Sequence, residues 1–219
     1  MKKALIVYGG WDGHTPEESA KVFAPFLADE GYDVTLSDTL DSYTDESLMG
    51  EVDLIVPIWT MGELSSDQSK GLRNAVRQGA GLAGFHGGII DSFRQDVTYQ
   101  WMTGGQWVAH PGGVIERYEV TITDSDHEIT AGIDDFQLVD TEQYYLHVDP
   151  AVHVLATTTF TGEHGETDLY PAGTVMPYAW TRNWGEGRVF VAAWGHTYKD
   201  FDVPEAKEIV QRGMLWASR

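Results

Sequence analysis

Residues 81–90 read GLAGFHGGII and combine a short apolar run with a histidine set among glycines. The apolar residues 81–85 predict a buried strand. Gly84, His86 and Gly88 match the Gly-x-nucleophile-x-Gly spacing of a nucleophile elbow, where a tight turn presents one side chain to the ligand cleft. Imidazole in place of serine or cysteine favours proton transfer or metal ligation. A histidine that only caps the following helix fits the same pattern.

The chain before this elbow alternates apolar runs with amphipathic segments. Strands are predicted over residues 4–8, 33–37 and 54–59, and helices from Pro16 to Gly31 and over residues 65–78. Thr15 is expected to cap the first helix through its hydroxyl, with proline in the first turn. This order predicts an open, mostly parallel α/β sheet with helices on both faces. The loops that follow its strands should share the rim where such sheets bind ligands.

The second half of the chain is richer in strands. Strands are predicted over residues 114–123 and 152–159, a hairpin over 176–182 and 188–193, and helices over 95–102 and 204–217. The sequence contains no repeat, low-complexity tract or linker. We therefore expect one domain, residues 1–219.

Composition restricts the function. The formal net charge is −20, a field that repels nucleic acid and anionic membranes, so a neutral small molecule is the expected partner. The chain has no cysteine, which excludes a thiol nucleophile and cysteine-ligated metal sites. The apolar run near the N-terminus is too short for a signal peptide or a membrane helix. We expect a cytoplasmic protein.

Four stretches together resemble the ThuA-like (trehalose utilisation) family. They are the elbow, YGGWDGHTPEES (8–19), DHEITAGIDDFQLVDTEQYYLH (126–147) and WTRNWGEGRVFVAAWGHT (180–197). The resemblance covers nearly the whole chain and implies a flavodoxin-like, class I glutamine amidotransferase-like fold. It also implies a role in sugar catabolism, on oxidised 3-keto-glycosides made by a partner dehydrogenase. Amidotransferases use a cysteine at the elbow, so glutamine hydrolysis is excluded here.

Three of the eight histidines, His14, His86 and His196, follow predicted strands. The resemblance supports a functional role for His14 and places Glu142 at the cleft. Tyrosines follow Glu142, and partial desolvation there would raise the pKa of its carboxyl toward the range useful for acid–base work. The alternative for His14 is an exposed histidine of a loop. The alternative for Glu142 is one more carboxylate of the acidic surface.

Aromatic side chains supply the candidates for substrate contact. The chain has eight tryptophans, and indole rings offer apolar area with a polar handle on which sugar rings can stack. The candidates stand near glycines, strand ends or the cleft: Trp11, Trp59, Trp101, His110, Tyr144 and Trp180. Core packing is the alternative for the tryptophans, and orienting a loop is the alternative for His110.

These residues support three hypotheses. In the first, an enzyme acts on a keto-sugar or keto-glycoside, with His86 and Glu142 as acid and base and His14 and His196 positioning hydroxyls. No sequence motif indicates a cofactor. Some of these histidine and glutamate residues could instead bind a divalent metal such as zinc, which would polarise the carbonyl. In the second, a non-catalytic sugar-binding or regulatory module has kept the scaffold. In the third, an edge strand or aromatic patch builds a homo-oligomer, with a dimer expected on symmetry grounds.

Overall fold

The computed structural model describes residues 1–165 and 167–219. Its strands are β1 (Lys2–Gly10), β2 (Tyr32–Ser37), β3 (Leu54–Thr60), β4 (Gly81–Phe85), β5 (Gly105–Ala109), β6 (Val114–Ile122), β7 (Phe136–Glu142), β8 (Tyr145–Val148), β9 (His153–Phe160), β10 (Thr174–Trp184) and β11 (Gly187–Ala192). Its α-helices are α1 (Pro16–Asp29), α2 (Glu46–Glu51), α3 (Ser66–Arg77), α4 (Gly87–Ile90), α5 (Val97–Thr103) and α6 (Pro204–Ala217). Short 3-10 helices are η1 (Asp12–His14), η2 (Leu40–Thr44) and η3 (Tyr198–Asp202).

Nine strands form one sheet in the order β2-β1-β3-β4-β11-β10-β9-β6-β7. Neighbouring strands from β2 to β11 pair in parallel, and those from β11 to β7 pair antiparallel. Strands β5 and β8 form a separate antiparallel pair. The predicted hairpin is confirmed as β10 and β11, and β11 joins the two halves by pairing with β4 on its other side.

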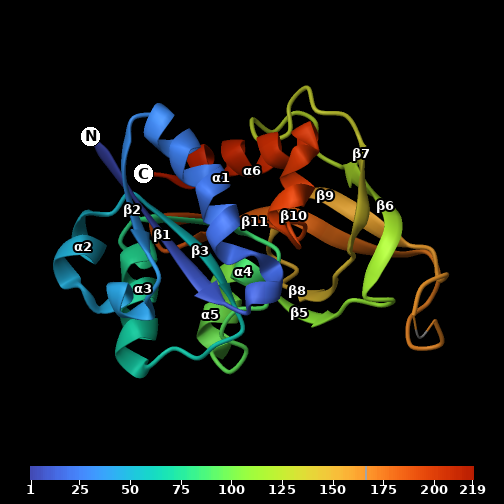
Figure 1. The fold of residues 1–219 in the computed structure, drawn as a ribbon, viewed down its shortest axis with the longest axis horizontal. Helices are drawn as coiled ribbons and strands as arrows, with labels where there is room; N and C mark the ends of the chain where they lie inside the picture. Colours follow the sequence, from blue (N-terminus) through green and yellow to red (C-terminus); the bar gives the residue numbers. More distant parts are fainter. Residues whose placement is uncertain (166) are drawn as a thin grey trace.

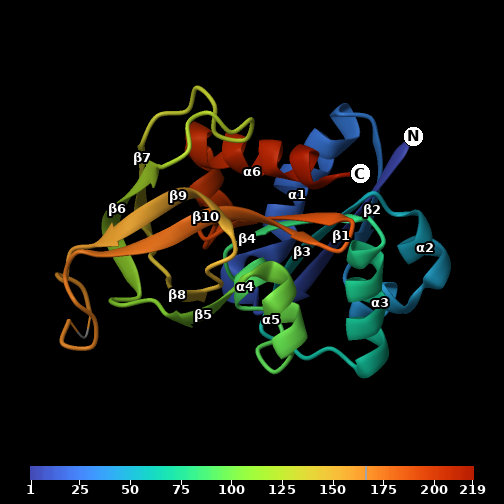
Figure 2. The same cartoon turned by 180° about the vertical axis from the view of Figure 1, so that it is seen from behind.

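Helices cover both faces of the sheet. Figures 1 and 2 show α1 and α6 on one side of it and α3 and α5 on the other. Helix α6 lies close to β11 because Gly213 has no side chain; a Cβ there would stand 2.3 Å from the ring of Phe190. The fold class predicted from the sequence, an open, mostly parallel α/β sheet between helices, is thus confirmed, with an antiparallel extension.

The start of the first helix corrects one expectation. Helix α1 begins at Pro16, as predicted, but Thr15 makes no capping hydrogen bond and adopts a left-handed backbone with φ of 47°. Its hydroxyl oxygen instead accepts a hydrogen bond of 3.0 Å from the backbone N–H of Tyr198. Thr15 therefore ties the loop after β1 to the segment after β11, where two of the candidate histidines lie.

No helix in the described parts of the chain combines the length and the apolar character needed to cross a bilayer.

Candidate functional site

His86 occupies the sharp bend between β4 and α4. Its backbone has φ of 46° and ψ of −142°, a region that non-glycine residues adopt only where the surroundings enforce it. Its backbone N–H donates to Ala192 O at 2.7 Å, which holds the bend against β11. A Cβ on Gly87 would stand 2.5 Å from Nδ1 of His14. The glycine after the bend therefore lets a second imidazole approach His86.

Four candidate residues from distant parts of the chain meet at this bend. His14 ends η1, Glu142 ends β7, and His196 follows β11. One potential ligand atom from each of these residues and from His86 lies within 4.8 Å of the others. Oε2 of Glu142 is 3.2 Å from Nε2 of His86, 3.3 Å from Nδ1 of His196 and 3.7 Å from Nε2 of His14. We call these four residues the histidine–glutamate cluster.

The hydrogen bonds of His86 fix which of its nitrogens carries the proton. Nδ1 lies 3.0 Å from the backbone carbonyl of Ala193, and a carbonyl only accepts, so Nδ1 carries the hydrogen. Burial lowers the pKa of His86 to about 3, which keeps the ring neutral at pH 7. The Tyr144 ring stacks on it with centroids 3.8 Å apart. Nε2 therefore presents a bare lone pair to the Glu142 carboxylate.

The carboxylate of Glu142 is buried and ionised. Burial raises its pKa, but the imidazole groups of His14, His196 and His86 around Oε2 lower it by more, to well below the usual range. A carboxylate oxygen and a bare imidazole nitrogen repel each other at 3.2 Å unless a positive species lies between them. The site therefore favours a bound cation or a shared proton.

The remaining two histidines of the cluster also direct nitrogens toward Glu142. Nδ1 of His14 is hydrogen-bonded to the Thr60 hydroxyl at 2.8 Å, which leaves Nε2 facing the carboxylate. Nδ1 of His196 is buried and has no hydrogen-bond partner among the described residues. A buried polar atom without a partner is destabilising, so this nitrogen is suited to a ligand.

The donor set fits a divalent metal. Three imidazoles and one carboxylate are ligand types that suit zinc. Structural zinc sites commonly have four protein ligands, and catalytic zinc sites commonly have three protein ligands and one open position. Second contacts orient two of the rings, through the Thr60 hydroxyl for His14 and the Ala193 carbonyl for His86, as is usual for metal-bound histidines. This fit rests on the geometry of the four residues.

Asp200 positions two members of the cluster. Its Oδ2 accepts hydrogen bonds from the Thr141 hydroxyl at 2.8 Å, from Gly195 N–H at 3.1 Å and from His196 N–H at 3.0 Å. Thr141 precedes Glu142 on β7. The buried Asp200 carboxylate therefore joins the strand that carries Glu142 to the turn that carries His196.

Replacing Asp200 with alanine is expected to weaken metal binding by about 10–100-fold, the usual effect of losing an outer-shell partner. Asp200→Asn keeps an acceptor oxygen and should stay within a few-fold of wild type. Zinc titration by calorimetry measures both, with the melting temperature recorded to separate binding from folding. An Asp200→Ala protein that binds zinc as wild type does would show that this carboxylate does not position the cluster.

The structure places the predicted substrate-contact residues at different distances from the cluster. The ring of Trp11 is half-exposed and lies 4.7 Å from that of His14, measured between centroids. Nε2 of His110 is 4.0 Å from Oε1 of Glu142. Tyr144 is buried behind His86 and supports it.

Three tryptophans are not brought to the cluster. Trp180 is fully buried and donates its indole N–H to Thr103 O at 2.8 Å, so it is a core residue. Trp101 is exposed on α5, where its ring pairs with that of Trp184. The Trp59 ring packs closely against Gly9 and Gly62, so closely that a Cβ on either glycine would collide with it. None of the three contacts a cluster residue in the described interactions.

The ThuA family model, described as trehalose utilisation, matches residues 3–217. A crystal structure described as a ThuA-like protein from Bacteroides uniformis has a TM-score of 0.80 at 16% identity, covering 99% of this chain and 91% of that one. A second, from Parabacteroides merdae, has a TM-score of 0.79 at 16% identity, covering 99% and 89%.

A more distant likeness involves a much larger protein. A β-galactosidase from Bacillus circulans sp. alkalophilus has a TM-score of 0.61 at 11% identity, covering 99% of this chain and 30% of that one. At these identities the structural matches show the fold alone. No curated protein sequence matches the chain.

Proposed function

Because the chain belongs to the ThuA family, described as trehalose utilisation, we propose that it is a metal-dependent enzyme of carbohydrate catabolism. Its substrate is a sugar or a 3-keto-glycoside, and His14, His86, Glu142 and His196 hold a divalent metal, with zinc preferred. The observation that carries this proposal is the convergence of three imidazole nitrogens on one carboxylate oxygen within 3.7 Å. Its position at the ends of β1, β4 and β11 agrees with the ligand rim of open α/β sheets.

A bound divalent metal supplies Lewis acidity that polarises a carbonyl oxygen. Two rings of the cluster are held in fixed orientations by hydrogen bonds, His86 by the Ala193 carbonyl and His14 by the Thr60 hydroxyl. If His86 and Glu142 held the metal, the proton transfer expected of them from the sequence would pass to a neighbouring residue.

His110 is the neighbour best placed to move a proton. Its Nε2 lies 4.0 Å from Oε1 of Glu142 and its side chain is partly exposed. Its Nδ1 has no hydrogen-bond partner among the described residues. We assign to Nε2 of His110 the acceptance of the proton that leaves the carbon next to the substrate carbonyl.

Metal content tests the proposal directly. The purified protein is expected to carry about one zinc per chain, as a site with four protein ligands requires. Chelation should abolish turnover of 3-keto-trehalose or 3-keto-glucosides, and added zinc should restore it. Elemental analysis and a turnover assay before and after chelation provide the measurement.

The remaining outcomes distinguish the alternatives. Turnover that survives complete removal of metal would replace the metal site with metal-free acid–base catalysis by His86 and Glu142. Binding of the sugar without turnover, at full metal occupancy, would indicate a non-catalytic sugar-binding module.

A further inference from the structure

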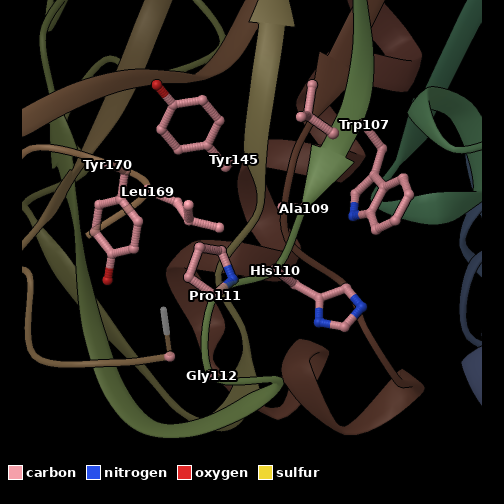
Figure 3. Close-up of a pocket in the computed structure, with 10 residues that line it drawn as sticks. Trp107, Ala109, His110, Pro111, Gly112, Tyr145, Leu169 and Tyr170 are labelled. Atoms are coloured by element: carbon pink, nitrogen blue, oxygen red, sulfur yellow. The ribbon is translucent and has the colours of Figure 1, made fainter. Parts of the chain in front are cut away.

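A cavity of about 500 Å³ lies beside the histidine–glutamate cluster. Its walls come from β5 and the loop after it, from Tyr145 on β8, and from Gly165, Leu169 and Tyr170 between β9 and β10. Figure 3 shows Trp107 and His110 on one side of it and Tyr145, Leu169 and Tyr170 on the other. The volume is within the range of small-molecule sites.

The cavity and the cluster share one residue. His110 lines the cavity, and its Nε2 is 4.0 Å from Oε1 of Glu142. The Trp107 ring lies 5.6 Å from the His110 ring and 6.3 Å from that of Tyr144, measured between centroids. Tyr144 in turn stacks on His86. His110 therefore stands between the cluster and the cavity, within 4.0 Å of Glu142 on one side and lining the cavity on the other.

The chemistry of the walls is aromatic and apolar. The largest side chains of the lining are those of Trp107, Tyr145, Leu169 and Tyr170, and no described lining residue carries a carboxylate, a guanidinium or an amide side chain. The Tyr170 hydroxyl already donates to His164 O at 2.6 Å. Such walls attract a flat apolar group.

A second sugar ring suits these walls less well. Each sugar hydroxyl that is buried without a hydrogen-bond partner is destabilising. Besides the tyrosine hydroxyls, the only polar side-chain atoms of the described lining are the nitrogens of Trp107 and His110, and Nε1 of Trp107 and Nδ1 of His110 are buried. The described side chains of the lining would therefore leave most hydroxyls of a second sugar ring without partners.

We infer that this cavity is the subsite for an uncharged aromatic aglycone, so that the substrate class is aryl glycosides whose sugar is oxidised to the ketone. The inference rests on the proposed function, because the cluster must hold the sugar end. The glycosidic oxygen lies near His110 and the aryl ring contacts Trp107, Tyr145 and Leu169.

Calorimetric binding of matched ligands to the purified, zinc-loaded protein tests this assignment. Phenyl and methyl 3-keto-glucosides of the same anomeric configuration differ only in the aglycone. The phenyl ligand is expected to bind about tenfold more tightly, as an aromatic contact of this kind provides. Equal affinities, or tighter binding of 3-keto-trehalose than of the phenyl ligand, would overturn the inference.

Variants localise the effect. Trp107→Ala should bring the phenyl-to-methyl affinity ratio close to one, and Leu169→Ala, at a largely exposed position, should lower it severalfold without affecting folding. Trp101→Ala is the matched control, because Trp101 does not line the cavity, and should keep the wild-type ratio. A ratio unchanged in both cavity variants would show that the aryl ring binds elsewhere.

Turnover separates this inference from the proposed function. A phenyl preference without turnover of either ligand would contradict the proposed enzyme and leave the aryl subsite standing. Turnover of both ligands without any phenyl preference would contradict the aryl subsite alone.

Discussion

Replacing Glu142 with glutamine is expected to lower turnover by roughly 10²–10⁴-fold, the scale on which a positioned proton-transfer or charge-stabilising group acts. Glutamine has the same shape but no charge, so the cluster loses its one carboxylate ligand. Zinc affinity should fall by more than the roughly 10–100-fold typical of an outer-shell change. Elemental analysis and a zinc titration measure the loss.

The same substitution is expected to preserve or raise the stability of the metal-free protein. The glutamine amide can donate a hydrogen to the bare Nε2 of His86, whereas the carboxylate oxygen now faces that lone pair at 3.2 Å. Urea unfolding after chelation provides the free energy of unfolding. A clear loss of stability in the metal-free variant would mean that His86 carries its proton on Nε2 and that the pair is a plain hydrogen bond.

Glu116→Gln is the matched control for this experiment. The Glu116 side chain is exposed on β6 and, among the described residues, forms an ion pair with its neighbour Arg117. Exposed ion pairs contribute about 0–1 kcal/mol, so metal content, turnover and stability should stay at wild-type values. A similar loss of zinc in Glu116→Gln would show that net charge, and not the cluster, controls metal binding.

Replacing Trp180 with alanine is expected to lower the free energy of unfolding by about 3–5 kcal/mol, the usual effect of removing a large aromatic side chain from a core. Trp180 is fully buried on β10, and its indole N–H donates to Thr103 O. The substitution would leave a cavity and remove the donor of a buried carbonyl. Urea denaturation followed by circular dichroism measures the change.

Trp101→Ala controls for the loss of an indole as such. Trp101 is 61% exposed, and surface substitutions change stability by about 0.5 kcal/mol or less. A Trp180→Ala protein as stable as Trp101→Ala would contradict the buried position of Trp180.

Most strands and helices of the fold could be predicted from local patterns in the sequence. The apolar runs 4–8 and 81–85 and the helix that begins at Pro16 correspond to β1, β4 and α1, because short-range periodicity and proline placement decide such elements. Thr15 was misread as a cap because its hydroxyl has a partner 183 positions away, the Tyr198 N–H. Local reasoning contains no information about that partner.

The candidate site could be predicted only in part, for the same reason. His14, His86 and His196 stand at strand ends, and the parallel order of these strands places them on one edge. Their roles stay predictions. The role of Asp200 could not be predicted from the sequence, because the chain has many carboxylates. Only the structure shows that three hydrogen-bond donors surround this one.

The burial of each tryptophan could not be predicted from the sequence either. Trp101 lies within a predicted helix and Trp180 within a predicted strand, yet Trp101 is exposed on α5 and Trp180 is enclosed in the core. The difference depends on which elements pack over each ring, and that is decided by tertiary contacts.

The place of β11 affects how the chain can fold during synthesis. Every other strand of the sheet precedes it in sequence, yet it lies between β4 and β10 in the middle of the sheet. Before residues 187–192 are synthesised, β4 and β10 lack the strand that pairs with both of them, and unpaired strand edges favour association with other chains. The bend at His86 is also completed late, since it is held by Ala192. The site can therefore be completed only after β11 has been synthesised.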